Sequence, residues 1–148
     1  MSLSHYCSNI MALGELLNEE RGKQISARVF SEAEEPLTEI TGMGNMKLKD
    51  ADVITDWTLF VTFGNNGIAY RQGKGYMYLH NKEIASYTMS SITKPDSPDI
   101  ASSRGISRIS CSSYDNPKIS SLLDGMAAVY ELEQDNDGNY SAKFWEWK

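Results

Sequence analysis

The clearest pattern of hydrophobic and polar positions lies in the middle of the chain. Every second residue from 57 to 63 is large and apolar, and threonines and Phe60 lie between: Trp57, Leu59, Val61, Phe63. A period of two is typical of a half-buried strand. Turn residues at 64–67, 73–75 and 81–82 then separate expected strands at 68–72, 76–80 and 84–92. We therefore expect a four-stranded antiparallel meander.

Near the start of the chain, the apolar residues follow a different period. Tyr6, Ile10, Leu13 and Leu17 lie three or four residues apart, which predicts one apolar stripe on a helix that ends near Gly22. Alternation then predicts a strand over 24–31 and a short one over 37–40. Segments 41–56 and 93–105 are rich in glycine, proline or polar residues, and we expect loops there, with a short strand near 46–48.

The C-terminal third predicts a strand over 107–113, a short helix and a hairpin. Pro117 suits the first position of a helix that runs to Leu123 and stops at Gly125. Alternation over 127–133 and 140–147, around a turn at 134–139, predicts the hairpin. The expected fold class is α+β, in which the N-terminal helix packs on a mostly antiparallel, meander-type β-sheet with a C-terminal β-hairpin. Residues 1–148 show no linker, so a single globular domain is expected.

Charge and composition limit the classes of partner that we expect. The 148 residues carry a formal net charge of −6. Such a surface repels phosphate backbones, so nucleic acid is not an expected partner. No apolar run is long enough to span a bilayer, and the first 17 residues, which have no Lys or Arg, do not resemble a signal peptide. The two cysteines, Cys7 and Cys111, suit a reducing cytoplasm.

Motifs that would carry chemistry are incomplete. Glu133, Asp135 and Asp137 match three positions of a calcium loop, but Phe144 stands where that loop needs a bidentate Glu. The glycines from Gly64 to Gly75 could cradle phosphate, but the helix that such loops require is missing. A Cys111–His80 nucleophile pair stays open without a local signature. We expect no metal, no cofactor and no catalytic residue. The incomplete motifs favour a protein that is not an enzyme.

The leading functional hypothesis is a protein-binding module, of the inhibitor or immunity and anti-defence type. It would bind a partner stoichiometrically through acidic residues that meet a basic site on that partner. Aromatic residues occupy both faces of the last strand, so one face could serve as an anchor. The expected partner-binding residues are Glu32, Glu34, Glu35, Trp145 and Trp147.

Two alternatives remain. The first is a small-molecule (nucleotide-like) binding protein or enzyme with a pocket on the central meander. Its aromatic and basic residues would be Tyr70, Arg71, Lys74, Tyr76, Tyr78 and His80. The second is an assembly subunit, a homo-oligomer included, whose edge strand pairs with another chain.

Overall fold

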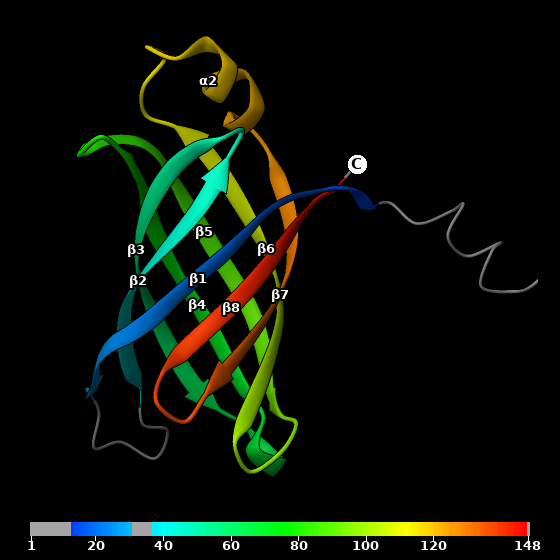
Figure 1. The fold of residues 1–148 in the computed structure, drawn as a ribbon. Helices are drawn as coiled ribbons and strands as arrows, with labels where there is room; N and C mark the ends of the chain where they lie inside the picture. The colour runs from blue at the N-terminus through cyan, green and yellow to red at the C-terminus, as the bar shows by residue number, and fades with distance from the viewer. Residues whose placement is uncertain (1–12, 31–36, 148) are drawn as a thin grey trace, which may run out of the picture.

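Eight antiparallel strands close into a barrel in the computed structural model, which describes residues 13–30 and 37–147. Each strand pairs with its neighbours in sequence, and β1 also pairs with β8, as Figure 1 shows for the blue and red strands. The strands are β1 (Leu13–Val29), β2 (Thr38–Leu48), β3 (Ala51–Phe63), β4 (Ala69–Leu79), β5 (Lys82–Pro95), β6 (Ile100–Cys111), β7 (Ala127–Asp135) and β8 (Asn139–Trp147). A 3-10 turn, η1 (Asn65–Gly67), follows β3, and a helix, α2 (Pro117–Leu123), lies between β6 and β7.

Alternation along β3 separates the barrel interior from its outer wall. Val53, Thr55, Trp57, Leu59 and Val61 are buried, and the residues between them are half-buried or exposed. β-Branched and aromatic side chains fit such a half-buried, pleated surface, so the local preference agrees with the fold. The same period continues through the neighbouring strands because the register from β2 to β4 is unbroken.

Closure depends on the long strand β1, which pairs with β8 on one side and with β2 on the other. Gly22 lies opposite both Tyr140 and Gly44, and Glu20 lies opposite Ala142 and Met46. The register shifts between Gln24 and Ser26, beyond which β1 continues with β2 alone. The closed part of the barrel has no unpaired strand edge, whereas residues 26–29 of β1 pair on one side only.

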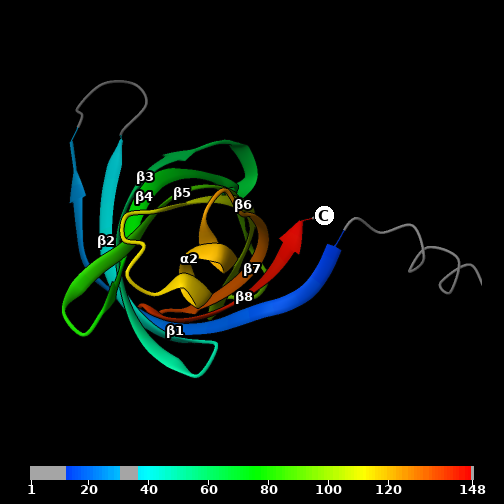
Figure 2. The same cartoon turned by 90° about the horizontal axis from the view of Figure 1, so that it is seen from above.

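Helix α2 covers one end of the barrel (Figure 2). The Asn116 side chain caps it by accepting hydrogen bonds from the backbone N–H groups of Lys118 and Ile119, at 3.2 and 3.4 Å. Pro117 lies in the first turn, where its missing N–H costs nothing. The buried side chains Ile119 and Leu123 join the core, so the helix closes this end with apolar groups.

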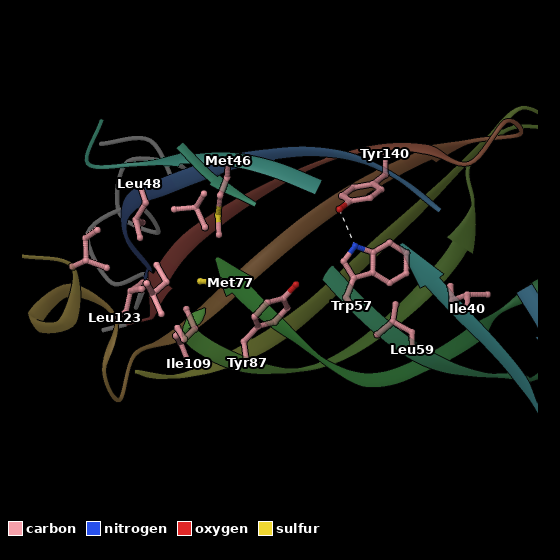
Figure 3. Packing of buried hydrophobic residues seen from close by; sticks show 14 of the residues in the cluster. Ile40, Met46, Leu48, Trp57, Leu59, Met77, Tyr87, Ile109, Leu123 and Tyr140 are labelled. Atoms are coloured by element: carbon pink, nitrogen blue, oxygen red, sulfur yellow. Dashed lines mark hydrogen bonds between the residues drawn. The ribbon is translucent and has the colours of Figure 1, made fainter. Parts of the chain in front are cut away.

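The interior changes character along its length (Figure 3). Near α2 it is filled by aliphatic side chains, among them Leu48, Ile109 and Leu123. Farther from the helix the large rings of Tyr87, Trp57 and Tyr140 follow. The barrel is therefore plugged at the α2 end and becomes aromatic and polar beyond it.

The structure contradicts the predicted α+β class. The described chain is almost entirely antiparallel strand, with one short helix and no helical layer on a sheet. The predicted N-terminal helix is wrong where it can be compared, because residues 13–22 belong to β1; residues 1–12 lie outside the described part. Gly22 does not end a helix but faces Tyr140 across the β1–β8 pair.

Two predicted loops and one predicted turn are also wrong. Residues 41–48 belong to β2, which contains the short strand expected near 46–48, and residues 51–56 begin β3. β5 and β6 extend through most of 93–105. β4 runs straight through Gly73 and Gly75, where a turn was expected. The short helix at Pro117–Leu123, the turn at 64–67 and the final hairpin are confirmed. The described residues form one barrel, and the single domain over 1–148 stays a prediction.

Candidate functional site

Interior glycines leave the space that the buried polar groups occupy. A Cβ atom at Gly44 would lie 2.8 Å from Oε2 of Glu20 and 2.9 Å from the Thr55 hydroxyl, and closer still to the hydroxyl of Tyr140. Real Cβ contacts are not that short, so only glycine is compatible with this arrangement. Three polar side chains from β1, β3 and β8 therefore meet over the β2 backbone.

A buried hydrogen-bond chain runs through this point. Trp57 donates its indole N–H to the Tyr140 hydroxyl at 2.9 Å, and Tyr140 donates to Oε2 of Glu20 at 2.5 Å. The two rings also meet edge to face, with centroids 5.6 Å apart. Figure 3 shows the Trp57–Tyr140 bond inside the barrel. The chain fixes the orientation of the Glu20 carboxyl group.

Burial raises the pKa of Glu20 to about 7, because a charged carboxylate loses its hydration inside the barrel. The Tyr140 hydroxyl opposes this rise, and the Thr55 hydroxyl does so to a smaller extent. Thr55 lies near the carboxyl group, but its buried hydroxyl makes no hydrogen bond of good geometry. Glu20 therefore changes between its neutral and charged forms near neutral pH.

Arg71 brings a positive charge into the same interior. It projects inward from β4, and its Nη2 donates to Oε1 of Gln134 at 3.3 Å; Gln134 in turn donates to Gln24 at 2.9 Å. Its Nε is buried and has no hydrogen-bond partner. Within the part of the chain that the structure describes, no ion pair reaches Arg71. Burial lowers the pKa of Arg71, and Tyr130 opposes that shift.

Glu20 and Arg71 line one interior cavity, together with the rings of Trp57, Tyr87, Tyr130 and Phe144. We call this space the interior cavity; it measures about 30 Å³. Burial raises the pKa of Tyr130, the Glu20 charge adds to the rise, and Ser91 and Arg71 oppose it. Tyr130 therefore lies within electrostatic reach of both charged groups, which face one cavity without forming a pair.

The structure separates the six residues predicted to bind a small molecule. Only Arg71 reaches the interior cavity. Lys74, Tyr76 and Tyr78 lie on the outer wall, around a groove of about 410 Å³ that also contains Asp56. Tyr70 is exposed on the same wall, and His80 lies exposed in the β4–β5 turn with a positive φ of 50°.

The predicted partner-binding residues are only partly placed. Trp147 is 53% exposed on the outer wall, where it lines a groove of about 570 Å³ with Phe60 and Ile106. Trp145 is half-buried and lies opposite Val129 of β7 and Leu16 of β1. Glu32, Glu34 and Glu35 lie outside the described residues.

The acidic segment considered for calcium forms the β7–β8 turn. The Asp135 carboxylate accepts hydrogen bonds from the backbone N–H groups of Asp137 and Asn139, at 2.9 and 3.0 Å. These bonds give the aspartate a role in the turn. Over residues 13–30 and 37–147, no cluster of three His, Cys, Asp or Glu side chains is arranged to hold a metal ion. None of the helices in these ranges has the length and apolar character needed to span a membrane.

Sequence reasoning missed Glu20, Tyr140, Trp57, Tyr130 and Gln134 as cavity residues. Glu20 was assigned to a helix, and Trp57 and Tyr140 were interpreted only as strand residues. One signal was present: small barrels often alternate small and large inward residues. Gly42 and Gly44 occupy alternate positions of β2, and a Cβ at Gly42 would overlap the Trp57 ring.

The fold and this interior define an eight-stranded antiparallel barrel with a polar, aromatic-lined cavity. Two solved structures share the fold. The conserved protein of unknown function RPA1785 from Rhodopseudomonas palustris has a TM-score of 0.72 and 10% identity, over 90% of this chain and 97% of the other. A protein with unknown function from Clostridium acetobutylicum ATCC 824 has a TM-score of 0.66 and 9% identity, over 90% and 98%. No protein-family model and no curated protein matches the chain.

Proposed function

We propose that the protein binds a small, largely apolar molecule inside the barrel. One observation carries this proposal: the buried carboxyl group of Glu20 and the half-buried side chain of Arg71, whose Nε is buried, line the same cavity but do not pair with each other. Barrels of eight strands either fill their interior with side chains or hold one small ligand. A barrel that is only filled would favour apolar groups at both positions.

Burying Glu20 and Arg71 costs free energy. A buried polar group without a hydrogen-bond partner costs roughly 1–3 kcal/mol, and more when the group is charged. The unpaired Arg71 Nε bears this cost, and the raised pKa of Glu20 reflects the related cost of burying a charge. Features that reduce stability in this way concentrate at binding and catalytic sites, where a ligand supplies the missing partner.

The size of the cavity sets a condition on binding. About 30 Å³ is room for one or two water molecules, so a ring-sized ligand must displace side chains. Met89, Leu132 and Phe144 line the cavity and are half-buried rather than fully packed. Methionine in particular adapts its shape at little cost. The aliphatic plug beneath α2 closes one end, so we place the entry at the opposite end, where Gln24 and Gln134 lie.

Isothermal titration calorimetry with 2-naphthoate and its neutral isostere 2-naphthamide tests the proposal. At least one of them is expected to bind with one-to-one stoichiometry. Leu132→Trp fills the cavity and should abolish binding, whereas Glu131→Trp, on the outer wall of the same strand, should not. Circular dichroism confirms that both variants fold. Absence of binding for both probes, or full binding by a folded Leu132→Trp, would contradict the proposal.

A second candidate function is protein binding, as an inhibitor or immunity-type protein in the cytoplasm. The exposed Trp147 in its outer groove favours it, since tryptophan is a frequent anchor in interfaces. A tagged protein should then capture one stoichiometric partner from its native lysate, and Trp147→Ala should lose that partner while remaining folded. Equal capture by both proteins would dismiss this surface.

A further inference from the structure

We infer that Arg71 is the anchor for a carboxylate, so that the ligand of the interior cavity is a monocarboxylate with an aromatic or apolar body. The inference rests on the proposed function and specifies its ligand. It starts from the hydrogen-bonding capacity of one side chain. Arginine has five N–H donors in a planar fork, and in this protein one of its terminal nitrogens donates to Gln134 while Nε has no partner.

The unpaired Nε–H of Arg71 can donate a hydrogen bond to an anion. A guanidinium group binds a carboxylate through two parallel hydrogen bonds, a geometry that matches the planar fork and is stronger than a neutral contact. Arg71 supplies a single positive charge, and among the described residues no second Lys or Arg lines the interior cavity. One cation matches one negative charge, which favours a carboxylate over a doubly charged phosphate.

Gln24 and Gln134 hold Arg71 in place. The Gln134 carbonyl oxygen accepts from Arg71, and its amide donates to the Gln24 carbonyl oxygen, so both glutamines are oriented by the chain that ends at the guanidinium. Neither glutamine neutralises the charge. The side chain is therefore positioned but not paired, as a preorganised anion anchor should be.

The rest of the lining selects the body of the ligand. Tyr130 and Phe144 form a ring pair with centroids 5.2 Å apart, and both line the cavity with Trp57. Flat apolar groups pack well against such rings. The Glu20 carboxyl group, which accepts from Tyr140, lines the same cavity, so a second acid group on the ligand would meet a like charge. A ligand with a single carboxylate, placed at Arg71, avoids that repulsion.

The test compares 2-naphthoate and 2-naphthamide, which differ in charge but not in shape. By calorimetry at pH 7.5 the wild-type protein should bind the carboxylate at least about tenfold more tightly, the size expected for a charge-assisted pair. Arg71→Met should remove this preference, so that the variant binds the two probes with equal affinity. Arg108→Met, an exposed outer-wall arginine on β6, should keep the preference.

If Arg71→Met does not fold, a measurement on the wild-type protein still tests the inference. The Arg71 Nε–H resonance in a 15N–1H spectrum should shift farther downfield with 2-naphthoate than with 2-naphthamide, because a carboxylate is the stronger acceptor. Equal wild-type affinity for the two probes, or a preference that survives in folded Arg71→Met, would overturn the inference while the proposed function stands. If neither probe binds, both fail together.

Discussion

The Tyr140 hydroxyl donates a 2.5 Å hydrogen bond to the carboxyl group of Glu20, a residue 120 positions away in the chain. The bond crosses the β1–β8 pair that closes the barrel, and Glu20 lies two residues along β1 from Gly22, the register partner of Tyr140. Strand closure therefore brings these two polar side chains together inside the barrel.

The first prediction concerns the pH dependence of stability. Glu20 has a pKa of about 7 in the folded protein against an ordinary value of 4.5, so the folded state holds the proton more tightly. The contribution of Glu20 is then most favourable below pH 4.5 and declines as the pH rises to about 7. A shift of that size corresponds to ~3 kcal/mol.

Glu20→Gln removes this titration and keeps an acceptor for Tyr140. Urea denaturation should show the variant to be more stable than the wild type above pH 7, by up to ~3 kcal/mol, with a difference that vanishes toward pH 4.5. Glu19→Gln, on the outward face of the same strand, should show no such trend. A pH-independent difference between Glu20→Gln and the wild type would be incompatible with a buried, titrating carboxyl group.

The second prediction removes the central hydroxyl. Tyr140→Phe leaves the Trp57 indole N–H and the Glu20 carboxyl group without their shared partner. The free energy of unfolding should fall by about 1–3 kcal/mol, and the pKa of Glu20 should rise further, because the lost hydrogen bond had lowered it. Tyr70→Phe on the outer wall is the control. Equal stability of the two variants would show that the hydrogen-bond chain has no energetic role.

The helical error at the N-terminus has a physical cause. Inside most sheets the buried face is apolar, and that makes period-two alternation visible. The inward positions of β1 around the seam carry Glu20, Gly22 and Gln24, so the alternation is lost and the spaced apolar residues before them fit a helical period. β3, whose inward residues are mostly apolar, was predicted correctly from residue 57 onward.

Glycine caused the error in β4. Gly73 and Gly75 indicate a turn when judged by local preference, yet they lie within β4, and Gly75 faces the Tyr87 ring with no room for a Cβ. That role depends on a ring from another strand, which local sequence does not reveal. Of the candidate site, only Arg71 was identified, since the cavity is assembled from strands that meet only when the barrel closes.

The third prediction concerns the lack of room for a side chain at Gly44. Gly44→Ala should destabilise the barrel by about 1–3 kcal/mol, because the new methyl group overlaps the Glu20–Tyr140–Thr55 meeting point. Gly64→Ala is a matched control: Gly64 is exposed with a φ of −96°, and its nearest neighbour is the exposed Tyr70 ring at 3.1 Å, which can move. Thermal or urea unfolding compares them. A smaller loss at Gly44 than at Gly64 would contradict the packing described.

The fourth prediction concerns the plug formed by α2. Leu123 is 2% exposed, and Leu123→Ala should lower the free energy of unfolding by about 2–5 kcal/mol through lost packing and a residual cavity. Ser121→Ala, exposed on the same helix, should change it little. Urea denaturation measures both. Similar, small effects at both positions would mean that α2 does not seal the barrel end.

The location of a bound probe inside the barrel can be observed directly. Intermolecular nuclear Overhauser effects between 2-naphthoate ring protons and the protein provide the most direct measurement. We expect cross-peaks to the Trp57 and Tyr130 rings and to the methyl groups of Met89 and Leu132, which line the interior cavity. Cross-peaks only to outward residues such as Tyr76 and Ile106, or none at all, would contradict binding inside the barrel.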